Sequence, residues 1–313
     1  MFHCSCRGRF IAAAVIQCAL LSGGANATEN GGTNYPIGVN TITPGVQPPP
    51  GTYGYLYLAA YESTSLKDNS GNAVGNVSNF SLHAQAAAVR VAHVWRGLSL
   101  LGATVETRAN IPFCNIDIHF DAHTPHGDVY KSSHAAGLSD IVFAPVMLGW
   151  HNGDLHQVAG LEFFLPTGSY DVNRLANPGR HYYSIEPTYA LTWFPTQRVE
   201  LSARALYEFN TINNATDYRS GQEFIVDYNA AFKLTQAWQI GVSGYFYRQM
   251  TDDMQHGQVV NGNGNRGQVL GVGPFIGYMT RKIAVAFKYQ RETLVRNRPE
   301  GNRFWLQVYM PFE

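Results

Sequence analysis

The sequence predicts an all-β protein: a transmembrane antiparallel up-and-down β-barrel of about 12 strands in the bacterial outer membrane. Three observations predict it, namely long stretches of strict alternation, connections that are long and short by turns, and a composition poor in charge. Only 14% of the residues are charged and 45% are hydrophobic, whereas about a quarter are charged in typical soluble domains. Such a composition suits a barrel wall that faces lipid.

The clearest alternation lies in residues 198–234. Two strands are expected there, 198–210 and 222–234. Apolar residues such as Leu201 alternate with polar residues such as Glu200, which is the period of a half-buried strand. In a soluble sandwich the polar face would meet water, whereas in a membrane barrel the apolar face meets lipid and the charges line the lumen. Alternation alone leaves both arrangements open.

Strand-like segments continue from residue 51 to the end of the chain. The expected strands are 52–64, 80–95, 98–111, 138–150, 154–166, 181–194, 198–210, 222–234, 238–250, 267–279, 282–294 and 302–312. Bacterial barrels have an even number of strands, and this count is even.

The connections between these strands decide between the two arrangements. Short links such as 96–97 and 280–281 alternate with long links such as 65–79 and 112–137. Outer-membrane barrels have short periplasmic turns and long extracellular loops, a rule that a soluble sandwich has no reason to follow. Aromatic residues that favour a membrane interface flank the short turns: Trp95, Trp150, Trp193, Phe194 and Trp238. The pattern therefore favours a membrane barrel.

Residues 1–27 have the three parts of a secretory signal peptide. A basic start precedes the apolar run 10–21, and Ala25-Asn26-Ala27 forms a cleavage site. We expect export to the outer membrane of a Gram-negative bacterium and a mature chain that begins at Thr28. Cleavage would leave Cys114 as the single cysteine, which offers no intramolecular disulfide.

Residues 28–50 form a separate segment, rich in proline and glycine, before the barrel of residues 51–313. Its run Pro48-Pro49-Pro50 favours polyproline II over a ladder strand. The composition favours a flexible periplasmic tether. The alternative is a plug in the barrel mouth, for which apolar residues such as Ile37 and Val39 argue.

Charged residues on the polar faces of the strands are candidates to line the channel. They are Glu106, Arg108, Glu200, Arg204, Glu208, Glu223, Asp227, Lys233 and Lys288. Buried opposite charges must pair, so these residues would form a salt-bridge network or a polar conduit that sets selectivity. Twelve strands lie between filled barrels of about 8 strands and open porins of about 16–18. We expect a narrow or plugged channel.

The long link 112–137 is rich in His and Asp. His119, His123 and His126 are weak candidates for metal ligands, because imidazole beside carboxylate suits Zn, Cu or Ni. Their spacing matches no closed site, and a long loop holds geometry poorly. We therefore expect a polar surface loop, with no metal and no cofactor.

Neither an enzyme nor a nucleic-acid-binding protein is indicated. Ser81 and His83 share a strand face, but no third member of a catalytic group is evident. The balanced charge offers no basic patch for nucleic acid. The expected partners are outer-membrane lipid and a small-molecule solute, and the oligomeric state is left open.

Several motifs between Pro48 and Phe312 resemble a known family, the phenol meta-pathway degradation proteins. The segments that carry the resemblance are 137–150, 164–171, 214–224, 244–253, 264–267, 273–274 and 297–301. The resemblance implies an outer-membrane barrel that admits aromatic or other hydrophobic compounds. The name of the family reflects operon context and not a catalytic role. The family defines no agreed catalytic or binding residues, so the resemblance supplies none. Two functions stay open: a passive channel for such solutes, and a structural or adhesive barrel that acts through its long extracellular loops.

Overall fold

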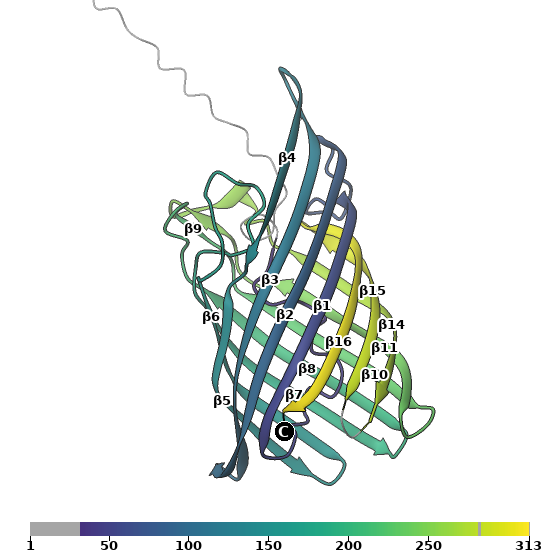
Figure 1. Ribbon diagram of the computed structural model, residues 1–313. Helices are drawn as coiled ribbons and strands as arrows, with labels where there is room; N and C mark the ends of the chain where they lie inside the picture. The colour runs from purple at the N-terminus through teal and green to yellow at the C-terminus, as the bar shows by residue number, and fades with distance from the viewer. Residues whose placement is uncertain (1–31, 281–282, 313) are drawn as a thin grey trace, which may run out of the picture.

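The computed structural model describes residues 32–280 and 283–312, and within them twelve strands close into one antiparallel barrel (Figure 1). The barrel strands are β1 (Gly51–Leu66), β2 (Val77–Leu100), β3 (Ala103–Thr124), β5 (Ile141–Asn152), β6 (Leu155–Leu165), β7 (Ser184–Thr196), β8 (Val199–Asn210), β10 (Glu223–Lys233), β11 (Trp238–Gln249), β14 (Gln268–Met279), β15 (Ala284–Arg296) and β16 (Pro299–Phe312). β1 pairs with β2 on one side and with β16 on the other, so the ring has no open edge. This confirms the predicted fold.

The alternation in the sequence determines which side chains face out. On β8, Glu200, Arg204 and Glu208 are buried, whereas Leu201 is 39% exposed. Large apolar side chains such as Phe287 are exposed on the outer wall, as a lipid-facing surface requires. Among the residues that the structure describes, no helix is both long and apolar enough to cross a membrane.

The β2–β3 turn lies at Leu101-Gly102, so the predicted turn at Arg96-Gly97 is wrong. Leu101 and Gly102 both have positive φ, at 54° and 73°, which is the backbone of a two-residue hairpin turn that matches strand twist. Gly97 also has positive φ, but it lies at an irregularity of the β2–β3 ladder, between Val94 and Ser99. The sequence offers two glycines here, and the structure turns at the second.

The link 112–137 is a hairpin, and the prediction of a loop there is wrong. β3 continues to Thr124 and pairs with β4 (Gly127–Leu138), so the two strands project beyond the barrel (Figure 1). Two of the other long links carry short elements. The strands β9 (Tyr218–Arg219), β12 (Met254–Gln255) and β13 (Gln258–Val259) form a separate sheet, and the 3-10 helix η2 (Val260–Gly262) follows β13. These loops all lie at one end of the barrel, opposite the short turns and the chain's C-terminus (Figure 1).

Residues 32–50, which we name the lumen segment, run through the barrel. The Asn34 side-chain amide donates a hydrogen bond to the Ser184 hydroxyl at the loop end of β7. Gly45 N donates one to the Thr192 hydroxyl, near the turn end of the same strand. Ile37 is fully buried. This differs from the flexible tether that the composition favours, because the apolar side chains and the backbone of the segment find partners on the inner wall. The predicted signal peptide, residues 1–27, lies outside the described residues.

Candidate functional site

Two charged side chains on the barrel wall hold the centre of the lumen segment. Asp227 on β10 accepts hydrogen bonds from the Tyr35 phenol (2.8 Å), from Gly38 N (2.7 Å) and from Asn40 N (2.9 Å). Lys288 on β15 donates to the carbonyls of Gly38 (2.7 Å) and Val39 (2.9 Å) and to the Thr41 hydroxyl (3.1 Å). The segment thereby supplies the polar partners that these buried charges require.

Tyr35 is the donor in its bond to Asp227. The ring also lies 5.2 Å from the Arg204 guanidinium carbon, which is a cation–π distance. Tyr35 therefore links the segment to both a carboxylate and a cation of the wall.

Further contacts follow the segment towards the turn end. Thr43 N donates to Glu200 Oε1 at 2.9 Å, and Gly45 N donates to the Thr192 hydroxyl at 3.0 Å. The Gln47 amide donates to the Met147 carbonyl at 3.1 Å. The segment is thus bonded along much of its length and not only at one anchor.

Two glycines let the segment approach the wall. Gly38 has a φ of +84°, and a Cβ there would lie 2.4 Å from Gln290 Oε1 and 2.6 Å from Tyr245 Cδ1. A Cβ at Gly45 would lie 2.5 Å from Thr192 N. A larger residue at either position would have to move the segment away from the wall.

The buried charges of β3, β6, β7 and β8 form an ion-pair network. Glu162 pairs with two arginines. Its Oε1 lies 2.5 Å from Arg108 Nη2, and its Oε2 contacts Arg204 Nη2. Arg108 Nη1 lies 3.6 Å from Glu106 Oε1, and Arg204 Nη2 lies 4.0 Å from Glu186 Oε1. Neither Glu162 nor Glu186 was among the predicted lumen residues, because β6 and β7 alternate less cleanly than β8.

The other predicted lumen charges have three kinds of surroundings. Glu208 and Glu223 lie opposite one another in the β8–β10 register, so like charges are neighbours there. Glu200 accepts from the lumen segment, as Asp227 does. Lys233 lies at the turn end of β10, half-buried, with its ammonium 4.9 Å from the Phe194 ring centroid. The expectation that opposite charges pair therefore holds for part of the set only.

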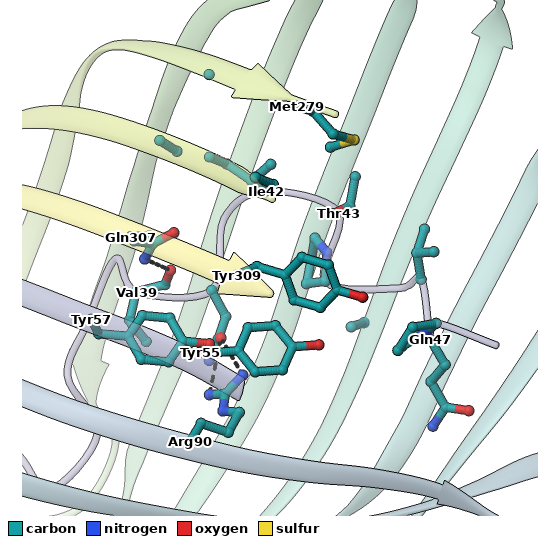
Figure 2. A pocket seen from close by; sticks show the side chains of 18 of the residues that line it. Val39, Ile42, Thr43, Gln47, Tyr55, Tyr57, Arg90, Met279, Gln307 and Tyr309 are labelled. Carbon is teal, nitrogen blue, oxygen red and sulfur yellow. Dashed lines mark hydrogen bonds between the residues drawn. The ribbon is translucent and has the colours of Figure 1, made fainter. Parts of the chain in front are cut away.

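Two cavities flank the lumen segment. One of about 400 Å³ opens towards the turn end, with Pro48, Met279 and Tyr309 among its lining residues. The other, of about 200 Å³, lies towards the loop end, next to Asp140 and Arg180. Figure 2 shows the larger cavity, in which the segment passes from Val39 through Ile42 to Gln47 around the wall tyrosines.

Tyrosines on β1 and β16 form an aromatic wall in the larger cavity. The rings of Tyr55 and Tyr57 are parallel, with centroids 6.2 Å apart, and Tyr309 lies 4.9 Å from Tyr55 (Figure 2). Sequence reasoning missed them because it assigned aromatic side chains to the lipid face. Their period-2 spacing, Tyr53-Gly-Tyr55-Leu-Tyr57, was the available signal, since Leu56 takes the outer face instead.

The histidine candidates lie on the projecting hairpin. His123 Nδ1 is 2.6 Å from Asp128 Oδ1, and His119 Nδ1 is 3.8 Å from Asp117. His126 is exposed at the hairpin turn. Among the described residues no group of three or more His, Cys, Asp or Glu side chains is arranged to hold a metal ion.

These features define a class: an outer-membrane-type β-barrel of twelve strands whose lumen holds its own N-terminal segment. The model of the family described as "Putative MetA-pathway of phenol degradation" matches residues 63–308. The chain belongs to that family, as the motifs in its sequence predict. No match is found among curated proteins.

Solved structures that are similar to this chain include three outer-membrane proteins. An outer membrane channel from Pseudomonas putida F1 is 16% identical, with a TM-score of 0.71 over 85% of this chain and 97% of that one. The NanC porin is 11% identical (TM-score 0.44, 82% and 100% coverage), and the translocator domain of the autotransporter NalP from Neisseria meningitidis is 9% identical (0.45, 87% and 92%). At 16% identity the likeness to the Pseudomonas putida channel concerns the fold alone.

Proposed function

We propose that this protein is a passive outer-membrane channel for small solutes, with residues 32–50 acting as a plug. The observation that carries the proposal is the pair of cavities along the lumen segment, one towards each end of the barrel. Together they trace a path that the segment interrupts. A modest movement of the segment would join them, whereas the barrel wall would keep its shape.

The solutes that fit this path are small aromatic or hydrophobic molecules. Tyr55, Tyr57 and Tyr309 offer stacking faces, and Ile42 and Met279 add apolar surface. The family description, which refers to phenol degradation, agrees with this solute class. Charged groups such as Arg108 and Glu106 lie at the cavity wall and would exclude solutes that are wholly apolar and bulky.

Transport through liposomes of outer-membrane-like lipid tests the proposal. The aromatic solute must be one that crosses a bare bilayer slowly, such as the zwitterion phenylalanine. Purified mature protein should raise the entry of phenylalanine above the rate in protein-free liposomes and should leave the entry of a bulky sugar such as raffinose at the protein-free rate. Equal entry of every solute in the presence and absence of protein would refute a channel.

A second candidate is a structural or adhesive barrel that acts through its extracellular loops. The projecting β3–β4 hairpin, with Tyr130 64% exposed near its tip, is the feature that favours it. Such a barrel would bind an external surface and would not need a solute path. The same liposome measurement separates the two, because an adhesive barrel would leave solute entry at the protein-free rate. Neither candidate involves catalysis.

A further inference from the structure

Arg90 on β2 differs from Arg108 and Arg204, the arginines of the ion-pair network. It is 9% exposed, and its Nε donates to Asn110 Oδ1 at 2.6 Å. Both terminal nitrogens donate to one atom, Asn40 Oδ1 of the lumen segment, at 3.2 Å each. Whereas Arg108 and Arg204 contact Glu162, no carboxylate in the described part of the chain lies within ion-pair distance of Arg90.

The Arg90–Asn40 contact lies where the two cavities meet. Among all lining residues the cavities share four: Val39, Asn40, Tyr57 and Arg90. Two of them belong to the lumen segment and two to the wall, and hydrogen bonds from Arg90 to Asn40 join the two sides. This contact is therefore the partition between the loop-end and turn-end cavities.

The surroundings of Arg90 suit a planar anion. Its guanidinium carbon lies 5.6 Å from the Tyr55 ring centroid and 4.9 Å from that of Tyr57. A guanidinium fork binds a carboxylate through two parallel, charge-assisted bonds, which are stronger than bonds to a neutral amide oxygen. A carboxylate can therefore replace Asn40, and an aromatic ring attached to it can stack on the neighbouring tyrosines. Glu106, which also lines the larger cavity, is engaged by Arg108.

We propose that Arg90 is an anion-recognition residue and Asn40 its gate. A small aromatic monocarboxylate that enters from the loop-end cavity takes the place of Asn40 on the guanidinium, and release of Asn40 joins the two cavities. This inference rests on the proposed channel function and deepens it, because it names the substrate class and the step that opens the path.

Binding of benzoate to the purified mature protein in detergent tests the recognition step, with benzyl alcohol as the neutral ligand of similar shape. Wild type should bind benzoate, and Arg90→Gln should weaken that binding about tenfold or more. Arg96→Gln, which removes an exposed cation from the same strand, should leave it unchanged. Equal benzoate binding by wild type and Arg90→Gln, or binding of benzyl alcohol as tight as that of benzoate, would overturn the proposal.

Asn40→Ala tests the gate without altering the barrel wall. It should retain benzoate binding and raise entry of phenylalanine, which crosses a bare bilayer slowly, into liposomes above the wild-type rate. An unchanged rate would refute the gate. If Arg90→Gln does not fold, Arg90→Lys keeps the charge but loses the fork, and it should bind benzoate more weakly than wild type; equal affinity would count against recognition. If the proposed channel function is wrong, the result is distinct, since wild-type protein would then raise the entry of no solute above the protein-free rate.

Discussion

Asp227 and Lys288 hold the same residue of the lumen segment from different strands. Asp227 Oδ1 accepts from Gly38 N at 2.7 Å, and Lys288 Nζ donates to Gly38 O at 2.7 Å. Their strands, β10 and β15, are separated in the barrel by β11 and β14. Two buried charges of opposite sign thus hold the N–H and the carbonyl of one residue in the lumen, and the positive φ of that residue favours glycine.

Gly38→Ala should release the lumen segment while the barrel stays folded. A Cβ at residue 38 meets Gln290 and Tyr245 and is strained at a φ of +84°. We expect higher ion conductance in planar bilayers and faster proteolysis of residues 32–50. Gly75→Ala is the matched control, because a Cβ there meets nothing within 4 Å. Identical conductance of the two variants would mean that the Gly38 contact does not hold the segment.

Glu162→Gln should lower the free energy of unfolding. The substitution leaves Arg108 and Arg204 as buried cations without their shared counter-charge. Loss of one partner from a buried ion pair costs about 3–5 kcal/mol. Urea unfolding in lipid vesicles measures the change, and Glu62→Gln, at an exposed position of β1, serves as the control. A loss no larger than the control's would show that the network adds little.

Val226→Arg should impair insertion into lipid. Val226 lies between the buried residues Ile225 and Asp227 on β10, so it faces outward near the middle of the strand. An arginine at the bilayer midplane costs about 2–4 kcal/mol on the lipid face of a barrel. Val172→Arg places the same side chain on an exposed loop and should cost little. If both variants fold into vesicles with equal free energy, the facing of β10 is misassigned.

Export should remove residues 1–27 and deliver the chain to the outer membrane. The basic start, the apolar run and Ala25-Asn26-Ala27 motivate this prediction. Amino-terminal sequencing of the membrane-extracted protein should begin at Thr28. A chain that retains its first residues, or that is recovered in the soluble periplasmic fraction, would contradict it.

The strands with strict alternation were predictable, and so were the lumen charges that they carry. Once the connections favour a membrane barrel, Glu200, Arg204 and Glu208 on β8 follow from period 2, since a one-residue change of register would place all three in lipid. Glu162 did not follow, because apolar residues lie on both faces of β6: Val158 and Phe164 share the face of Glu162, and Leu161 and Phe163 lie on the other. Its role depends on two arginines from other strands, which no local pattern reveals.

Features that depend on long-range contacts could not be predicted in the same way. The composition of residues 28–50 describes chain stiffness, whereas the position of the lumen segment depends on Asp227 and Lys288, far along the sequence. The Leu101-Gly102 turn and the β3–β4 hairpin depend on ladder register, which the glycine positions alone leave ambiguous. The tyrosines of β1 face inward because Leu56 and Leu58 occupy the outer wall.

Single-channel conductance with and without the lumen segment tests the central claim most directly. A chain that begins at residue 48 and a chain that begins at Thr28 would be refolded and compared in planar bilayers, after circular dichroism has shown equal strand content. The shorter chain should conduct clearly more than the longer one, because its lumen lacks the residues bonded to Asp227, Lys288 and Arg90. Equal conductance of the two chains would contradict the claim that this segment closes the barrel.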